Sequence, residues 1–246
     1  MIDRLQSQMQ AMQMLSRAQE VTANNLANLN TPGFKADKLF HRILTEQIDG
    51  EQVSRTVPMQ HISLAQGELE PTGGTFDFAI VGSGFFVVED DGQSNLTRNG
   101  RFQLDSDGYL RNDRGGYVMG QSGRIYIPEF FHATDREHGE ARLEVAKDGT
   151  IRLNDEVYDR LKVVRPENPS TLERRGNAYF TVPGTSLIQQ DPESEVVQGF
   201  FEKGNVQSLS EMTDMIKNMQ MFETQQRAMR TTDEMLSQAT SALGRF

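Results

Sequence analysis

The sequence predicts an α+β fold, in which N- and C-terminal helices pair in a coiled-coil-like bundle and a central all-β domain lies between them along the chain. Two distributions support this fold class. All but one of the glycines lie in residues 33–204, whereas all but two of the methionines lie in residues 1–14 or 212–235. Glycine is unfavourable inside helices and frequent in turns. The ends are therefore predicted to be helical, and the middle to be built from short strands.

The N-terminal helix, predicted over residues 1–33, has two apolar faces. One set of residues advances by three and four positions and comprises Ile2, Leu5, Met9 and Met12. A second set with the same period comprises Ala11, Leu15, Ala18, Thr22, Leu26 and Leu29. This period is typical of a helix that buries the corresponding face. About 28 helical residues extend about 40 Å, more than a small domain needs to cover itself, so both faces are expected to contact other helices.

The middle of the chain divides into a connector and a β domain. Residues 34–71 lack a strong apolar period and are predicted to form an extended connector that includes a short helix at residues 39–48. Residues 72–200 are predicted to form a compact β domain. Pairs that tolerate the positive φ of tight turns recur at short intervals there: Asp91-Gly92, Asn99-Gly100, Asp107-Gly108, Gly115-Gly116 and Asp148-Gly149. Their spacing predicts an antiparallel meander over residues 91–116.

The C-terminal segment, residues 201–246, is predicted to contain a long helix. Ser208 and Glu211 have the spacing of a capping box, which marks a helix start. Apolar residues then occupy heptad a and d positions: Met212, Met215, Met219, Phe222, Met229 and Leu236. A sustained heptad favours a coiled-coil-like seam. A single helix of this kind is usually docked on its own core, but two of them at opposite ends favour pairing with each other and with neighbouring molecules.

Composition excludes several classes of function. The net charge of −10 and the pI near 5.0 argue against nucleic-acid binding, which depends on Lys and Arg. The absence of cysteine excludes disulfides, thiolate catalysis and Cys-ligated zinc. No run approaches the roughly 18 apolar residues of a membrane span, so no direct membrane insertion is expected. The N-terminus has no apolar signal core, so any export from the cytoplasm is expected to proceed without a cleaved signal peptide.

Three local patterns are weak candidates for enzyme or metal chemistry. Gly82-Ser83-Gly84 is shorter than a nucleophile elbow and is followed by no helix signal. The segment 105–108 lacks the spacing of a calcium loop, and a hairpin turn explains it. His132 and His138 are six residues apart, which is a poor spacing for two ligands on one helix face. We therefore expect no catalytic, cofactor or metal site.

Five short segments together carry a resemblance to a known family. ANNLAN (23–28) and TPGFK (31–35) resemble the N-terminal signature of the bacterial flagellar axial proteins, the rod and hook family. In FAIVGSGFF (78–86), FAI with Gly82, Gly84, Phe85 and Phe86 is similar to its central segment, as is LTRNGRF (96–102). In QGFFEKGNV (198–206), QGFFE and the final Asn-Val are similar to its C-terminal segment, as is the helix that follows, whereas Lys203-Gly204 departs from the family pattern. The resemblance covers both ends and part of the middle.

The resemblance implies a structural subunit of the flagellar basal-body rod. Such a subunit polymerises helically into the axial drive shaft that transmits torque from the motor to the hook. The terminal segments 1–33 and 201–246 would form the inner tube of this shaft, in the periplasmic part of the basal body. The implied partners are copies of the chain, other rod and hook proteins, and the flagellar type III export apparatus.

The subtype follows from size and from the connector. The smallest rod proteins lack a β domain of this extent, and the hook protein is usually much longer. Residues 34–71 contain no clear equivalent of the Gly-rich insertion of the distal rod protein, so the proximal rod protein is favoured. The alternatives are a distal rod or hook-type axial subunit, and a secreted β-domain binding module.

The predicted site residues are those of subunit contacts. The apolar ones are Leu5, Met9, Met12, Leu15, Met212, Met215, Met219, Phe222, Met229 and Leu236. Asn24, Asn25 and Asn28 are predicted to form a polar band that sets register between subunits, as a buried Asn does in a coiled coil. Because neither end can bury both faces alone, the ends are expected to be disordered in the isolated monomer and to fold on assembly.

Overall fold

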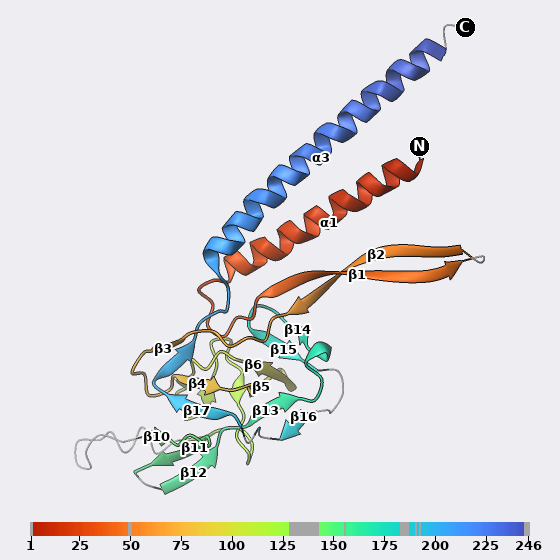
Figure 1. The fold of residues 1–246 in the computed structure, drawn as a ribbon. Helices are drawn as coiled ribbons and strands as arrows, with labels where there is room; N and C mark the ends of the chain where they lie inside the picture. The colour runs from red at the N-terminus through yellow and green to blue at the C-terminus, as the bar shows by residue number, and fades with distance from the viewer. Residues whose placement is uncertain are drawn as a thin grey trace. The chain divides into compact units, whose positions relative to one another are not determined.

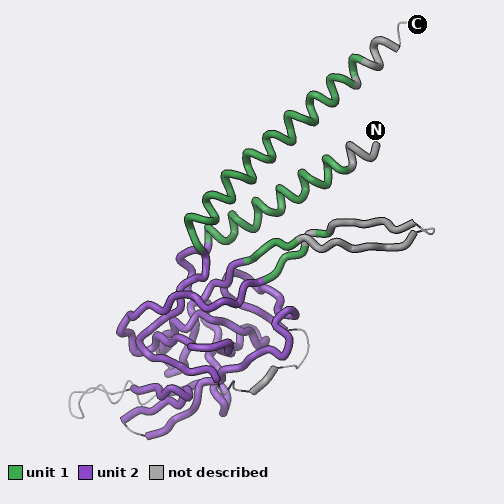
Figure 2. Tube along the Cα trace, in the orientation of Figure 1, with its two compact units in different colours: residues 1–27, 37–61, 207–246 green, residues 28–36, 62–206 purple. Residues whose placement is uncertain are grey.

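The protein is described by a computed structural model, which confirms the α+β fold class. The described residues are 2–48, 51–127, 143–154, 156–182, 187–189, 191 and 193–243. The chain forms two compact units (Figure 2). Unit 1 contains residues 1–27, 37–61 and 207–246, and unit 2 contains residues 28–36 and 62–206. This grouping differs from the predicted domains 1–33, 34–71, 72–200 and 201–246, which remain a prediction.

Unit 1 contains two long helices, α1 (Ile2–Ala27) and α3 (Ser208–Leu243). They contact each other and run antiparallel, so that the start of α1 and the end of α3 lie on the same side (Figure 1). None of the helices within the described residues combines the length and the hydropathy that a membrane-spanning helix needs. After Ala27 the chain enters turns that end at Gly33, whose φ of 67° is unfavourable for other residues.

Unit 1 also contains a two-stranded antiparallel hairpin, β1 (Asp37–Ile48) and β2 (Glu51–Ile62). The helix predicted at residues 39–48 is therefore wrong. Short apolar runs do not distinguish a helix from a strand by period alone. Here the residues of β2 supply the backbone partners, so pairing between two segments overrides the local preference.

Unit 2 is built from short strands and one 3₁₀ turn. Its strands are β3 (Leu69–Pro71), β4 (Phe78–Val81), β5 (Phe85–Asp90), β6 (Gln93–Thr97), β7 (Gln103–Leu104), β8 (Leu110–Arg111), β9 (Tyr117–Val118), β10 (Leu143–Val145), β11 (Thr150–Leu153), β12 (Glu156–Arg160), β13 (Val163–Pro166), β14 (Glu173–Arg174), β15 (Tyr179–Thr181), β16 (Leu187–Gln189), β17 (Glu195–Gln198) and β18 (Phe200–Glu202), with η1 at Pro169–Thr171. The largest sheet has the order β14-β15-β6-β5-β9-β8-β7, and β13 and β16 join it at β5. The remaining strands form a three-stranded sheet, β10-β11-β12, and the pairs β17-β4 and β18-β3.

The predicted turns are mostly confirmed. Asp91 and Gly92 have φ of 50° and 72° between the paired strands β5 and β6, and Gly115 and Gly149 also have positive φ in hairpin turns. Asn99-Gly100 is not a hairpin turn, because β6 and β7 are not neighbours. A Cβ at Gly100 would lie 1.8 Å from the carbonyl oxygen of Phe78, so glycine is needed there for close approach. The meander is therefore interrupted, and β9 returns beside β5.

Strand β5 explains where the core of unit 2 lies. Its side chains alternate, so that Phe86 and Val88 belong to one apolar cluster and Phe85 and Val87 to another. β13 follows the same rule with Val163 and Val164. A strand with both faces buried must be apolar at every position, which accounts for the continuous run FFVV.

Candidate interface helices and a buried polar junction

Helix α3 packs against α1 through one face. The side chains of this face are half-buried and recur every three or four residues: Glu211, Met215, Asn218, Phe222, Gln225, Met229 and Thr232. On α1 the corresponding set is Gln8, Ala11, Leu15, Ala18, Thr22 and Asn25. The structure thus places Met215, Phe222, Met229 and Leu15, from the predicted contact residues, on faces that are covered within the chain.

A second apolar row lies on α3 beside this packed face. Leu209, Met212, Ile216 and Met219 are 79, 49, 57 and 48 % exposed, and they advance by three, four and three residues. Met212 and Met219 were predicted, whereas Leu209 and Ile216 were missed. The heptad pattern places residues of two neighbouring rows in one seam, whereas the helical period of 3.6 residues assigns them to separate rows.

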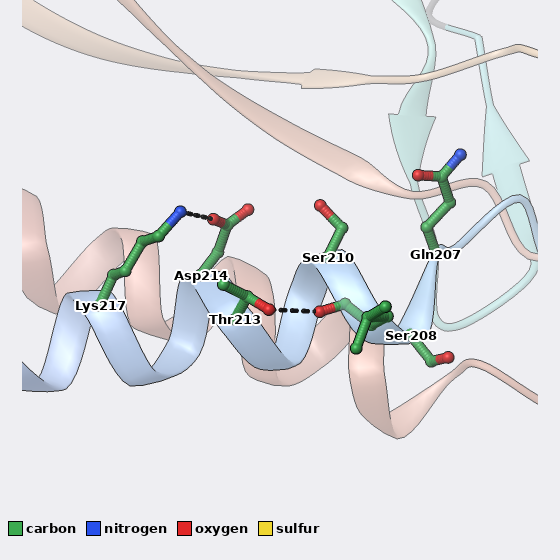
Figure 3. Close-up of a pocket in the computed structure, with 7 residues that line it drawn as sticks. Gln207, Ser208, Ser210, Thr213, Asp214 and Lys217 are labelled. Carbon is green, nitrogen blue, oxygen red and sulfur yellow. Dashed lines mark hydrogen bonds and ion pairs between the residues drawn. The ribbon is translucent and has the colours of Figure 1, made fainter.

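The first turns of α3 have a polar side as well (Figure 3). Lys217 pairs with Asp214 at 3.6 Å, and the hydroxyl of Thr213 donates to the carbonyl of Leu209 at 2.7 Å. Helix α3 begins at Ser208, within one residue of the predicted start, but the capping-box partners differ: the Glu211 amide donates to the Gln207 carbonyl at 3.0 Å, and the Glu211 carboxylate accepts from Asn25 at 3.1 Å. The exposed apolar row is therefore bounded by the packed face on one side and by charged residues on the other.

The remaining predicted contact residues have varied surroundings. On α1, Met12 is half-buried and Met9 is 53 % exposed. The side chains of Leu5 and Leu236 lie outside the part of the chain that is described at side-chain level. A groove between the two helices is lined by Leu15 of α1 and by Lys217, Gln220, Met221, Thr224 and Gln225 of α3.

The asparagines form bonds within the chain. The Asn25 carboxamide is buried. It donates to the backbone carbonyl of Asp37 and accepts from the backbone amide of the same residue, at 2.9 Å each. Asn28 is also buried, and its Oδ1 accepts from the Thr31 hydroxyl at 3.2 Å in the turn after α1. Asn24 is exposed. The predicted register band between subunits stays a prediction, and the structure gives two of its members a role inside one subunit.

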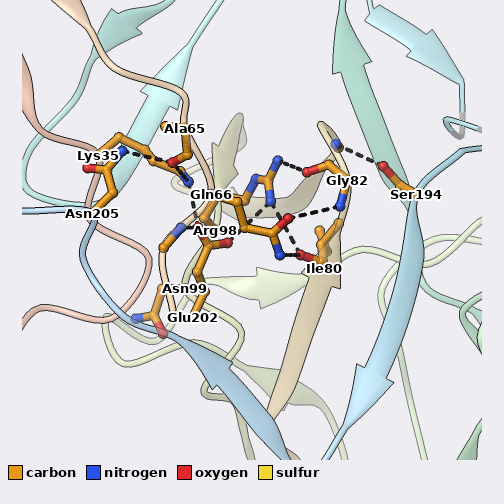
Figure 4. A network of polar contacts seen from close by, with 12 residues as sticks. Lys35, Ala65, Gln66, Ile80, Gly82, Arg98, Asn99, Ser194, Glu202 and Asn205 are labelled. Carbon is orange, nitrogen blue, oxygen red and sulfur yellow. Dashed lines mark hydrogen bonds and ion pairs between the residues drawn. The ribbon is translucent and has the colours of Figure 1, made fainter. Parts of the chain in front are cut away.

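Unit 2 contains a buried polar junction centred on Glu202 (Figure 4). Its Oε1 contacts Lys35 Nζ at 2.5 Å and accepts from the Gly67 amide at 2.8 Å, while Oε2 lies 3.2 Å from Arg98 NH1. The carbonyl of Glu202 also accepts from the Gly33 amide at 2.7 Å. One residue at the end of β18 therefore binds segments from three distant parts of the chain.

The two cations of the junction have further partners. Lys35 Nζ donates to the Ala65 carbonyl at 2.8 Å, and Arg98 NH2 donates to the Gly82 carbonyl at 2.6 Å. Arg98 also lies over the ring of Phe85, 5.0 Å from its centre. Each of these charged side chains is at most 2 % exposed. Buried charges are tolerated only with such partners.

Close backbone packing surrounds the junction. A Cβ at Gly33 would lie 2.2 Å from the Asn99 amide nitrogen, and one at Gly204 would lie 3.2 Å from the Leu29 carbonyl. Asn205 bridges the neighbouring segments, accepting from the Ala36 amide at 2.6 Å and donating to two carbonyls at 2.8 Å each. The signature segments TPGFK, LTRNGRF and QGFFEKGNV therefore meet at one place in the fold.

The junction carries an excess of positive charge, because two cations face one carboxylate. Burial lowers the pKa of Lys35 below its usual range, opposed by Glu202 and reinforced by Arg98. Burial likewise lowers the pKa of Arg98, again opposed by Glu202. Lys35, Arg98 and Glu202 all lie in the signature segments, but the sequence alone does not predict the ion pairs between them. The available signal was the presence of charged residues in signature segments that are otherwise rich in apolar residues and glycine, one in TPGFK and two each in LTRNGRF and QGFFEKGNV.

The weak chemical candidates have structural explanations. Ser83 donates to Asp191 at 3.1 Å, next to the bond that Ser194 Oγ accepts from the Gly84 amide. Asp105 accepts from the amides of Asp107 and Tyr109, as expected for a turn. Among the described residues no group of acidic or His side chains has the arrangement of a metal site. His132 and His138 lie outside the described residues.

Family models match three parts of the chain. "Flagella basal body rod protein" matches residues 5–35, "Flagellar hook protein FlgE/F/G D1 domain" matches residues 79–153, and "Flagellar basal body rod FlgEFG protein C-terminal" matches residues 197–242. The first and last of these contain most of α1 and most of α3. The second contains most of the strands of unit 2 that surround β5.

Relatives match over nearly the full length. The chain is 32 % identical over 241 residues to the flagellar basal-body rod protein FlgF of Caulobacter vibrioides, covering 94 % of each chain. It is 30 % identical over 244 residues to FlgF of Salmonella typhimurium, covering 92 % of each. It is 27 % identical over 251 residues to the flagellar basal-body rod protein FlgG of Bacillus subtilis, covering 89 % of this chain and 90 % of the relative. The chain therefore belongs to the family of flagellar basal-body rod proteins, which are structural subunits of the rod and not enzymes.

Proposed function

We propose that this chain is the proximal-type rod subunit, and that it polymerises helically through its terminal helices into the shaft that carries torque from the motor to the hook. The FlgF relatives, at 28 to 32 % identity, favour the proximal type over the FlgG relatives, at 27 to 28 %. The two long helices supply the contact surface. Other rod and hook proteins of the flagellum are the neighbours that follow from this role.

The exposed apolar row on α3 carries this proposal. Leu209, Met212, Ile216 and Met219 line one side of the helix over about three turns, and water contact with so many large apolar side chains is unfavourable. A helix from a second copy of the chain has the matching period and can cover the row. Methionine suits repeated helix contacts, because its flexible thioether adapts to different neighbours.

The threonines of α3 also favour helix packing. Their hydroxyls donate to the carbonyl four residues earlier, at 2.7 to 3.0 Å: Thr213, Thr224, Thr231 and Thr232. A hydroxyl bonded in this way does not need water as an acceptor when a neighbour approaches. The helix can therefore be covered by other subunits without leaving these donors unpaired.

Within the subunit, α1 and α3 are proposed to pair as a coiled-coil-like seam. The half-buried positions Met215, Phe222 and Met229 are seven residues apart, as one column of a heptad repeat requires. Asn218 and Gln225 stand on the same face between them. Polar residues inside such a seam reduce stability but fix its register, which suits a subunit that must adopt one geometry many times.

Membership of the family also supports a route and a location. We infer delivery through the flagellum's own type III export apparatus and assembly in the periplasmic part of the basal body. Direct membrane insertion is not part of the proposal. A fusion of the chain to a reporter should leave the cytoplasm only when the flagellar export apparatus is intact, and transport in its absence would contradict this route.

The decisive experiment uses a strain in which the gene is deleted and then restored. Purified basal bodies are examined by electron microscopy with the wild-type chain, with Met212→Asp/Ile216→Asp, and with the matched control Ser210→Asp, at an exposed position on the polar side of the same turns. Rods should form with the wild type and with the control. With the double variant, rods should be absent or truncated. Normal rods in the deletion strain would refute the proposed function. If a tag on the chain were located at the distal end of the rod, the chain would be a distal and not a proximal rod subunit.

A further inference from the structure

The carboxamide of Asn25 connects three elements of unit 1. Its Oδ1 accepts from the backbone amide of Asp37 at 2.9 Å, and its Nδ2 donates to the backbone carbonyl of the same residue at 2.9 Å. Exchange of both bonds with one residue is what a paired strand provides in an antiparallel sheet. Because Asp37 is the first residue of β1, the side chain of Asn25 acts as a one-residue strand at the start of the hairpin.

A third bond ties in the other helix. Asn25 Nδ2 also donates to Oε1 of Glu211 at 3.1 Å, in the first turn of α3. Both hydrogens of the carboxamide nitrogen are then used inside the chain. We name this group, the Asn25 carboxamide with the backbone of Asp37 and the carboxylate of Glu211, the Asn25 clasp. At 1 % exposure, Asn25 is among the most buried polar residues of the chain.

The charges around the clasp explain why an amide is needed. Glu211 is half-buried, and burial raises the pKa of its carboxyl, while the bond from Asn25 opposes this. Asp214 on the same helix raises that pKa further, and Lys38 on β1 lowers it. An aspartate at position 25 would have no hydrogens to donate and would face the Glu211 carboxylate. A leucine would leave the amide and carbonyl of Asp37 without their partner.

We propose that Asn25 is the positioning residue of unit 1, which fixes the start of the β1–β2 hairpin against the end of α1 and the first turn of α3 before the subunit enters the rod. The role in assembly rests on the proposed function, whereas the positioning itself does not. The clasp explains why position 25 is an asparagine, although a leucine there would fit the face of α1 that packs against α3. It differs from a bond between subunits, because the donors of Asn25 are used inside its own subunit.

Thr22 supplies a matched control for burial. It lies one turn before Asn25 on the same face of α1, is 6 % exposed, and its hydroxyl donates to the carbonyl of Ala18 at 2.9 Å. Thr22→Val removes this hydroxyl with little change of shape, and the bond that is lost is local to α1. If burial at the end of α1 were all that mattered, Thr22→Val and Asn25→Asp would have similar effects.

The test compares four forms of the full-length chain with the wild type: Asn25→Asp, Glu211→Gln, the double variant and Thr22→Val. The first readout is hydrogen exchange of the Asp37 amide in the purified protein. Asn25→Asp is expected to speed this exchange at least tenfold at pH 7. In the double variant, the carboxamide introduced by Glu211→Gln would donate to the new carboxylate, so that variant should recover part of the protection. Thr22→Val should leave the exchange within about twofold of the wild type.

The pH dependence adds a signature that general destabilisation lacks. In Asn25→Asp, protonation of either carboxyl would allow one to donate to the other, so protection of Asp37 should increase as the pH falls from 7 to 5, after correction for intrinsic exchange. The double variant and Thr22→Val should not show this recovery. Unchanged exchange in Asn25→Asp, or a double variant no better than the single one, would overturn the positioning role.

The second readout is rod formation in the restored deletion strain. Asn25→Asp should give fewer or shorter rods, and the double variant should restore them in part. Normal rods from Asn25→Asp with fast exchange at Asp37 would overturn the role in assembly while leaving the clasp intact. Rods that form without the gene would instead refute the proposed function, so the two failures are distinguishable.

Discussion

The two units differ in how completely they bury their large apolar side chains, of which unit 2 exposes Val81, Tyr126 and Val157 and unit 1 exposes a longer set. Unit 2 buries large apolar residues on both faces of β5 and even buries the ion pairs of Glu202. Unit 1 leaves large apolar side chains exposed, with Leu209 at 79 % and Ile216 at 57 %. A unit that buries most of its apolar side chains can fold without a neighbour. A unit that leaves them exposed is stabilised when other molecules cover them. The difference separates the part that folds within the subunit from the part that assembles.

The largest loss of stability is expected when the carboxylate of the junction in unit 2 is removed. Glu202→Gln would leave Lys35 and Arg98 buried without a carboxylate, and breaking a buried pair costs about 3 to 5 kcal/mol of folding free energy. Unit 2 should unfold at correspondingly lower denaturant concentration, followed by near-UV circular dichroism of its tyrosines. The control is Glu68→Gln, since Glu68 is 79 % exposed and 3.8 Å from Lys203. A Glu202→Gln variant within about 0.5 kcal/mol of the wild type would contradict this view of the junction.

A pair of truncations contrasts the two units directly. Leu96→Ala, in a buried cluster beside β5, should destabilise the monomer by about 2 to 5 kcal/mol. Met219→Ala, on the exposed row of α3, should change the stability of the monomer by less than about 0.5 kcal/mol but reduce rod formation. Denaturant unfolding measures the first effect and counts of intact basal bodies the second. Similar losses of monomer stability in both variants would remove the distinction between the units.

A smaller effect is expected from the pH dependence of the junction. The pKa of Lys35 is lowered in the folded state from its ordinary value of 10.5, so between the two values the unfolded chain binds more protons. Stability should therefore increase as the pH rises through the range below 10.5. Lys35→Met lacks this contribution, so the wild type should gain stability relative to the variant as the pH rises. A difference that stays constant or shrinks would show that Lys35 is not desolvated.

The sequence predicted those features of the fold that depend on local patterns. The contrast of Met and Gly located the helices and the β region, and Asp91-Gly92 marked a real hairpin turn. Residues 39–48 were wrongly predicted, because their state is decided by pairing with β2. Asn99-Gly100 was misread because a glycine required for contact with Phe78 has the same local signature as a turn.

The candidate sites were predictable to a lesser degree. The apolar residues of α3 were found, but their division between a packed and an exposed row depends on where α1 lies, and one helix alone does not contain that information. The partners of Asn25 and of Glu202 come from elements far away in sequence. Residue type signals that a polar group is buried, but only the fold determines which partner satisfies it.

The central claim is that assembly completes unit 1, whereas unit 2 is complete in the monomer. Hydrogen exchange, measured residue by residue in the dilute full-length monomer and in assembled rods, tests it most directly. In the monomer we expect protected amides in β5 and fast exchange in residues 7–20 and 212–235, beyond the Asn25 clasp. In rods the helices should become protected as well. Helical amides as protected as those of β5 in the dilute monomer would contradict the claim.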